Sequence, residues 1–236
     1  MFVPSPDEHM TPSKDRKLIL VGDSAFAEIA HEYFEVDSSY SVVAFSVERE
    51  YLRAEQKAGL PVVAFEDLTT YFDPQTHDVY VATVYTQLNR LRARLAAAAK
   101  QKGYRLASYI SPRAFVWRNV ELGEHCFIFE DNTVQPFVKL GHNVVLWSGN
   151  HIGHHSTVGD HCFISSQVVI SGFCEIGEYS FLGVNATVAN NVKVGPDNWI
   201  GPNTAIMKST PPGAFYRTVQ PEAYRLTAPQ FFKVGE

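Results

Sequence analysis

The sequence lacks the features that would place it across a membrane or on nucleic acid. It has no run of about 18 apolar residues, the length that a membrane-spanning helix needs. Residues 1–16 have no apolar core like that of a signal peptide, and we interpret them as a polar, mobile leader. Basic residues are not in excess either, since the net charge is −5, which argues against nucleic acid as the main partner.

Cysteine is scarce as well. The sequence has three, Cys126, Cys162 and Cys174, and an odd number argues against a disulfide framework. Together with the missing signal peptide, this predicts a reducing, cytoplasmic setting. Material for a core is present, because 45% of the 236 residues are hydrophobic and 19% are charged. We therefore expect one large or two modest folded domains.

The first half alternates short apolar runs with helical patterns. Apolar runs at 18–21, 41–45, 61–64 and 79–83 are typical of buried parallel strands. The turn at 22–25 leads into a helix that reaches about residue 34. A second helix over residues 86–102 is amphipathic, with this apolar spacing: Leu88, Leu91, Leu95 and Ala98. These patterns predict a small, open α/β domain of Rossmann type, with a mostly parallel sheet, over residues 17–108.

The second half follows a period of six. Every sixth residue from Ile110 to Ile206 is Ile, Leu or Val, without interruption. Small residues recur two positions earlier, and the three cysteines fall there, so we interpret them as core filler. A hexapeptide period predicts a parallel β-helix in which three hexads make one triangular coil, so residues eighteen apart stack. We expect a left-handed β-helix over 109–210 and a closing segment over 211–236.

The order of these two halves resembles the sialic acid O-acetyltransferase (NeuD-like) family, whose relatives include N-acetyltransferases of nucleotide-linked amino sugars. The stretch 79–90 is similar to that family's strand-turn-helix before the coils, and 212–221 is similar to its closing segment. The resemblance implies a homotrimer that holds acetyl-CoA or another acyl-CoA between neighbouring helices. It also implies that the N-terminal domain receives a nucleotide-linked sugar, for surface glycan synthesis.

Acyl transfer needs a base for the attacking amine or hydroxyl, and histidine suits this role near neutral pH. A dense cluster at 148–156 holds three histidines that flank the inward Ile152. In the family, the catalytic histidine stands two residues after the inward aliphatic, and this makes His154 the matching base. Relatives carry an acidic residue next to it, where this chain has His155, which is itself a candidate catalytic residue. The group that orients the base therefore stays open among Asn150, Asp160 and a residue of a neighbouring subunit.

The resemblance also implies residues for the acyl-CoA. Relatives often have a second histidine near the thioester, where this chain has Phe163, and an apolar contact is the simpler interpretation. Gly172 lies one coil beyond His154, and its N–H matches the family's oxyanion donor. Later coils would hold the pantetheine arm and the phosphates through these residues: Gly183, Ala189, Gly201 and Lys208.

The nucleotide-linked sugar is expected at the start of the first helix. A turn that follows a strand and opens a helix suits an anion or a nucleotide. The candidate residues are Gly22, Asp23, Ser24 and Ala25, with Thr83 at the end of a later strand. Relatives often carry acidic residues after the second strand, a role for which Glu48 is the substitute here.

Two alternatives remain. His125 and His161 are two coils apart, which fits part of the zinc site of γ-type carbonic anhydrases, although the position for the third ligand holds Ser166. The other alternative is a trimeric scaffold that binds a sugar nucleotide without turnover. The favoured hypothesis is a sugar N- or O-acetyltransferase that needs no metal.

Overall fold

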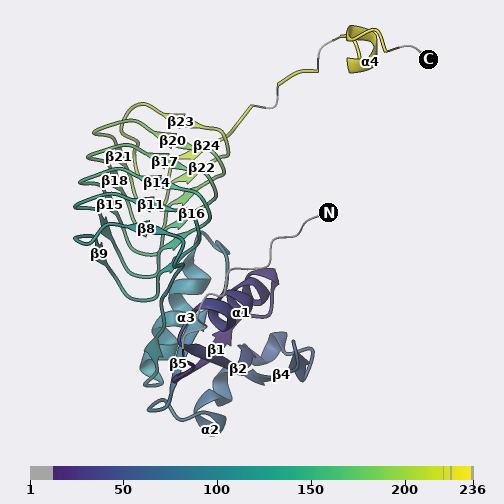
Figure 1. Ribbon diagram of the computed structural model, residues 1–236, viewed down its shortest axis with the longest axis vertical. Helices are drawn as coiled ribbons and strands as arrows, with labels where there is room; N and C mark the ends of the chain where they lie inside the picture. Colours follow the sequence, from purple (N-terminus) through teal and green to yellow (C-terminus); the bar gives the residue numbers. More distant parts are fainter. Residues whose placement is uncertain (1–12, 220, 224, 235–236) are drawn as a thin grey trace.

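The N-terminal half is built on a six-stranded sheet, in the lower part of Figure 1. The computed structural model describes residues 13–219, 221–223 and 225–234, and most of the predicted leader, 1–16, lies outside them. The strands are β1 Arg16–Val21, β2 Tyr40–Val47, β3 Gln56–Lys57, β4 Leu60–Ala64, β5 His77–Val81 and β6 Arg105–Leu106. Their order is β3-β4-β2-β1-β5-β6, and all pairs are parallel except β3 with β4. The predicted α/β class is confirmed, whereas the β3–β4 hairpin was not predicted.

Helices cover both faces of this sheet. They are α1 Ala25–Asp37, α2 Leu68–Tyr71 and α3 Arg90–Gln101, with 3-10 turns at Arg49–Tyr51 and Phe65–Asp67. Side chains alternate across a strand, so Leu18 and Leu20 of β1 join the cluster that includes α1. Ile19 and Val21 join the cluster that includes Leu95 of α3. Burial on both faces explains why β1 is a continuous apolar run. No helix among the described residues is long and apolar enough to cross a bilayer.

The C-terminal half is a stack of triangular coils with three parallel faces (Figure 1). The first face holds β7 Tyr109–Ile110, β10 Phe127–Ile128, β13 Val145–Leu146, β16 Phe163–Ile164, β19 Phe181–Leu182, β22 Trp199–Ile200 and β24 Phe215–Tyr216. The second holds β8 Phe115–Val116, β11 Thr133–Val134, β14 His151–Ile152, β17 Val169–Ile170, β20 Thr187–Val188 and β23 Ala205–Ile206. The third holds β9 Glu121–Leu122, β12 Lys139–Leu140, β15 Thr157–Val158, β18 Glu175–Ile176 and β21 Lys193–Val194.

The predicted period matches these strands residue for residue. Each repeated aliphatic, from Ile110 to Ile206, is the second residue of one strand from β7 to β23. Most are buried in one apolar cluster, which confirms the β-helix. Ile110 and Leu122 are 42% and 37% exposed, because they belong to the first coil and no earlier coil covers them. Beyond β24 the chain leaves the stack, and α4 (Ala228–Phe231) lies away from it (Figure 1).

The predicted core role of the cysteines is also confirmed. Cys126, Cys162 and Cys174 are at most 1% exposed. Burial raises the pKa of Cys126 to about 11 and that of Cys162 to about 12, so both thiols stay protonated and unreactive at neutral pH.

The first face of the β-helix packs on the N-terminal domain through aromatic rings. Phe127 contacts Phe26 and Phe34 of α1, with ring centroids 5.6 and 5.7 Å apart. Farther along this face, Phe163 lies 5.3 Å from Tyr85. The domain covers this face from β7 to β19, where the outward side chains are at most 6% exposed, so the opposite edge of the triangular prism points away from it. That opposite edge, formed by the turns that follow the second face, is called the His154 corner below.

A buried arginine completes the junction between the two halves. Arg92 of α3 is 0% exposed, and its Nε donates to Oδ1 of Asn143 in the β-helix (2.8 Å). Its Nη2 donates to the carbonyl of His161 (3.1 Å), and its Nη1 donates to the carbonyl of Val84 (2.9 Å). Burial lowers the pKa of Arg92 to about 10, so the side chain still carries its charge at neutral pH. One charged group therefore ties the helix to two successive coils.

His125 joins the same network from the first complete coil. Its Nε2 accepts the N–H of Val81 (2.8 Å), and its Nδ1 bonds Oδ1 of Asn143 (2.8 Å). The ring stacks on Tyr80 at 4.6 Å. Burial, aided by the charge of Arg92, lowers the pKa of His125 to about 3. The neutral ring thus bridges β5 and the β-helix across the physiological range.

Replacing Arg92 tests how strongly this network holds the two halves. Arg92→Met keeps much of the volume but leaves buried carbonyl oxygens without donors. We expect unfolding to become easier by about 2–4 kcal/mol, because buried partners of a charged group are costly to leave unpaired. Thermal and urea unfolding measure the change. Lys100→Met, on an exposed part of α3, is the matched control and should leave the melting temperature nearly unchanged. An equally stable Arg92→Met protein would contradict the assignment.

Candidate active site

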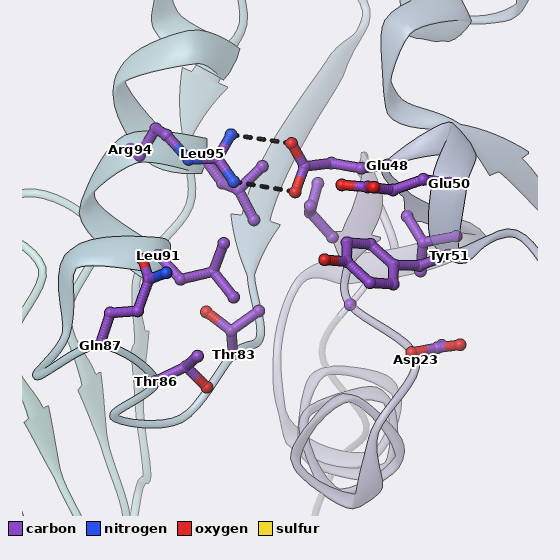
Figure 2. Close-up of a pocket in the computed structure, with 13 residues that line it drawn as sticks. Asp23, Glu48, Glu50, Tyr51, Thr83, Thr86, Gln87, Leu91, Arg94 and Leu95 are labelled. Atoms are coloured by element: carbon purple, nitrogen blue, oxygen red, sulfur yellow. Dashed lines mark hydrogen bonds and ion pairs between the residues drawn. The ribbon is translucent and has the colours of Figure 1, made fainter.

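The N-terminal domain has a cavity of about 540 Å³ at the carboxyl ends of β1, β2 and β5 (Figure 2). Strand order reverses between β1 and β5, and crevices at such switch points bind ligands in open α/β sheets. Four of the predicted residues line it: Gly22, Asp23, Glu48 and Thr83. Oγ1 of Thr83 is buried without a hydrogen-bond partner among the described residues, so it is available to a ligand.

The turn before α1 needs a glycine. Gly22 has φ +126°, and a Cβ there would come 2.7 Å from the carbonyl oxygen of Ala82. Ser24 is the N-cap residue of α1, without a capping bond from its side chain, and Ala25 is the first residue of that helix. Neither Ser24 nor Ala25 lines the cavity, so the structure separates them from the other two predicted turn residues.

Glu48 is not a free carboxylate. Both its oxygens accept hydrogen bonds from Arg94 of α3, each at 2.8 Å, in the paired geometry of Figure 2. These bonds hold the pKa of Glu48 below its usual range. Glu48 and Arg94 thus form a bridge across one side of the cavity, from β2 to α3.

Sequence reasoning missed several lining residues. They come from the 3-10 turn, the loop after β5 and α3: Glu50, Tyr51, Thr86, Gln87, Leu91 and Arg94. Leu91 was recognised only as part of an amphipathic helix, and its neighbour Arg94 one turn later carried no motif. In Figure 2 the Tyr51 ring lies at the side of the cavity opposite Leu91. The helical spacing of Leu91, Arg94 and Leu95 was the one signal that these residues share a face.

The second candidate region is the His154 corner. His154 and His155 are exposed in the turn between β14 and β15, whereas His151 is half-buried on β14. The N–H of His154 donates to Oε1 of Gln135 in the previous coil (2.9 Å). Its Nδ1 lies 3.1 Å from Nδ1 of His155. Its Nε2 has no hydrogen bond among the described residues and lies over Gly172 of the next coil.

Gly172 makes room for the His154 ring. A Cβ at this position would lie 2.7 Å from Cε1 and 2.9 Å from Nε2 of His154. The N–H of Gly172 donates to Oδ1 of Asn190 (2.9 Å), so an oxyanion at the predicted donor would have to displace that amide. Gly172 therefore gives the His154 ring space to lie against the coil, and its N–H is not free to bind an oxyanion.

Two predicted residues lie elsewhere. Asn150 is 1% exposed, and its amide donates to the carbonyl of Trp147 and accepts the N–H of Val168. Because both ends of the amide are used in another corner, Asn150 does not orient His154. Asp160 accepts the N–H of His142 in the third corner and is equally remote from that role.

Phe163 must be corrected as a residue for the acyl-CoA. It is 3% exposed on the first face, under the N-terminal domain, and belongs to the aromatic cluster there. The apolar contact with its neighbours in the column is confirmed by its stacking on Phe181 at 5.9 Å. A side chain on this covered face is not accessible to a thioester at the His154 corner.

The remaining predicted residues occupy two corners. Ala189 and Lys208 follow the second face, so they share the His154 corner, and Lys208 is exposed three coils beyond His154. Gly183 and Gly201 are buried in the turns that follow the first face. One chain therefore presents Gly172, Ala189 and Lys208 along a single edge, with the other two glycines on a different edge.

The histidines of the zinc alternative are occupied within the chain. Both ring nitrogens of His125 form the hydrogen bonds described above, and Nδ1 of His161 bonds Nδ2 of Asn143 (2.9 Å). Asn143 therefore bonds Nδ1 of both rings. The pair belongs to the junction with α3 and does not support a zinc site.

A comparison with protein families finds hexapeptide repeats in the part of the chain that forms the coils. The family described as bacterial transferase hexapeptide (six repeats) matches residues 137–172 and 155–190. The chain carries hexapeptide repeats. No curated protein matches the chain as a whole or in part.

Solved structures share both halves of the fold. The acetyltransferase domain of PglB from Neisseria gonorrhoeae is 24% identical, with a TM-score of 0.75, over 85% of this chain and 95% of that one. PerB from Caulobacter crescentus, solved with CoA and GDP-perosamine, is 23% identical, with a TM-score of 0.74, over 84% and 92%. WeeI from Acinetobacter baumannii is 18% identical, with a TM-score of 0.59, over 85% and 95%. The hexapeptide-repeat helix and the α/β domain thus recur together.

Gly172→Ala tests whether the missing side chain at position 172 sets the orientation of the His154 ring. The backbone of Gly172 lies outside the left-handed region, so alanine fits the main chain, and the added methyl must displace the ring. We expect a crystal structure of the variant to show His154 rotated away from His155, with a melting temperature within about 2 °C of wild type. An unmoved ring in a strongly destabilised protein would contradict this expectation.

Proposed function

We propose that the protein is an acetyltransferase that moves the acyl group of acetyl-CoA, or of another acyl-CoA, to an amino or hydroxyl group of a nucleotide-linked sugar. His154 is the general base in this proposal, and the reaction serves surface glycan synthesis in the cytoplasm. The observation that carries it is an exposed imidazole in a tight, glycine-lined corner of a hexapeptide-repeat helix. The shared fold supports it, since PerB was solved with CoA and GDP-perosamine.

The chemistry follows from the position of the ring. Nε2 of His154 accepts the proton of the attacking amine or hydroxyl as that group adds to the thioester carbonyl. The tetrahedral intermediate then collapses and expels the sulfur of CoA, which takes the proton back from the imidazolium. In this proposal the pantetheine arm lies along the corner that holds Gly172 and Ala189. Lys208, exposed farther along the same edge, suits the phosphates.

The sugar nucleotide is assigned to the cavity at the carboxyl ends of β1, β2 and β5. Its exposed Tyr51 ring offers a stacking surface for a base, and the unpartnered Oγ1 of Thr83 offers a hydrogen bond. The cavity is lined by three acidic residues and one arginine: Asp23, Glu48, Glu50 and Arg94. Such a balance favours hydrogen-bond donors of a base or sugar over a bare phosphate at the acidic side.

The cavity and His154 belong to opposite sides of one chain. The domain that holds the cavity covers the first face, and His154 lies at the corner between the other two faces. One chain therefore does not bring its own sugar to its own base. A homotrimer resolves this, because a neighbouring copy can present its cavity to the His154 corner.

The assignment of the base is tested by His154→Ala. We expect kcat to fall by about 100-fold or more, the usual scale for losing a general base. The assay measures thiol release from acetyl-CoA with a panel of nucleotide-linked amino sugars. His151→Ala, on the neighbouring strand, is the control and should stay close to wild type. Turnover near the wild-type rate in His154→Ala would reject the base, and binding without thiol release in the wild type would favour the scaffold alternative.

A mixing experiment tests the shared site. His154→Ala removes the base, and Thr86→Trp places a large ring in the cavity, so each variant alone should be inactive. After co-refolding in equal amounts, each mixed trimer regains one intact site, and about a quarter of the wild-type activity should return. No recovery, with mixed trimers verified by mass spectrometry, would place base and sugar within one chain.

A further inference from the structure

The exposed ring of His155 lies between two phenyl rings. Its ring stacks on Phe137 at 4.6 Å and 27°, and on Phe173 at 4.9 Å and 18°. All three residues have φ near +60° and occupy equivalent turn positions in successive coils. Phe137 and Phe173 are themselves 55% and 52% exposed, so the sandwich is not a consequence of core packing. Its evident effect is to fix the plane and direction of the His155 ring.

The fixed ring points one nitrogen at His154. The two Nδ1 atoms are 3.1 Å apart, a hydrogen-bonding distance. In a bond between two neutral imidazoles, one nitrogen donates and the other accepts. A base that works through Nε2 must carry its hydrogen on Nδ1. The pair is therefore productive when His154 Nδ1–H donates to Nδ1 of His155, which then carries its own hydrogen on Nε2.

Resting on the proposed function, we propose that His155 is a positioning residue that sets the tautomer of His154 and makes its basicity depend on the protonation of the pair. The two neutral rings together carry two N–H protons. When the pair takes up a third proton from solvent at lower pH, both nitrogens of His155 carry hydrogen. The His155 Nδ1–H then faces His154, whose own hydrogen must leave Nδ1 for Nε2, and the base is blocked. Each step moves one proton, and no other reactant is needed.

Other groups around the pair do not take over this role. The turns packed on it present Gln135, Phe137 and Phe173, which do not titrate. The ionisable groups on the flanking faces and along the same corner are His151, Cys174, Arg118, Lys208 and the ion pairs Glu121–Lys139 and Glu175–Lys193. Burial raises the pKa of Cys174, so this thiol carries no charge at neutral pH. The two ion pairs join at 3.0 and 2.8 Å, so their carboxylates are already engaged. Arg118 and Lys208 are two and three coils from His154 in the stacking register.

Two variants separate packing from proton placement. His155→Phe keeps an aromatic ring between the two phenyl groups but removes the acceptor. We expect kcat to fall about 10-fold, the lower end for losing a partner that orients a functional histidine. KM for acetyl-CoA and the melting temperature should change little. His155→Glu restores an acceptor, so kcat should recover most of the loss.

The pH profile distinguishes positioning from a structural role. A carboxylate at 155 stabilises the imidazolium form of His154, so the acid limb of kcat/KM in His155→Glu should move up by about one pH unit. The same limb in His155→Phe should not show that rise. Equal profiles in all three proteins, with equal kcat, would overturn the proposal.

Nitrogen NMR of the ligand-free, ¹⁵N-histidine-labelled protein decides the tautomer without any assay. His154→Ala and His155→Phe assign the two rings. We expect a protonated Nδ1 on His154 and a protonated Nε2 on His155 near neutral pH. Protonated Nε2 on His154 would overturn the proposal whatever the activity. The expected tautomers in a protein that releases no thiol would sustain the pair and refute the acetyltransferase function instead.

Discussion

The buried guanidinium of Arg92 is the constraint on which the arrangement of this molecule depends. A charge without water must find polar partners, and here the partners are carbonyl and amide oxygens of two coils and of the loop after β5. Because these acceptors have fixed places in the hexapeptide register, they fix where α3 lies along the prism. The orientation of α3 in turn sets Arg94 against Glu48 and forms one wall of the cavity. Neutral His125 in the same network avoids a second buried charge beside the first.

The two candidate regions follow opposite designs. The cavity is assembled from three strand ends, a 3-10 turn and a helix, so its shape depends on residues that are far apart in the sequence. The His154 corner is assembled from stacked copies of one turn, and the same position supplies Phe137, His155 and Phe173. Repetition makes the corner stiff without any tertiary support. That stiffness lets two exposed imidazoles keep a defined hydrogen bond.

The β-helix could be predicted to the residue because its physics is local and periodic. Each aliphatic needs only its neighbours six and eighteen residues away, and the sequence carries both. The exposure of Ile110 and Leu122 depends on which coil is terminal, and the six-residue period does not predict which coil that is. In the candidate site, Gly22 and Thr83 followed from the turn and strand ends, whereas His154 was singled out by the family resemblance. Arg92 and Arg94 look alike on an amphipathic helix, and only packing against Asn143 and Glu48 separates a structural arginine from a cavity-lining one.

The coil stack also acts as a ruler. Parallel strands stand about 4.8 Å apart, so positions along the His154 corner are available only in whole steps of that size. Three steps separate His154 from Lys208, which sets the two backbone positions about 14 Å apart along the corner. Gain or loss of eighteen residues between them would lengthen or shorten this reach by one step and leave both ends unchanged. The number of coils between the two positions therefore sets the length of ligand that this edge accommodates, independently of the chemistry at either end.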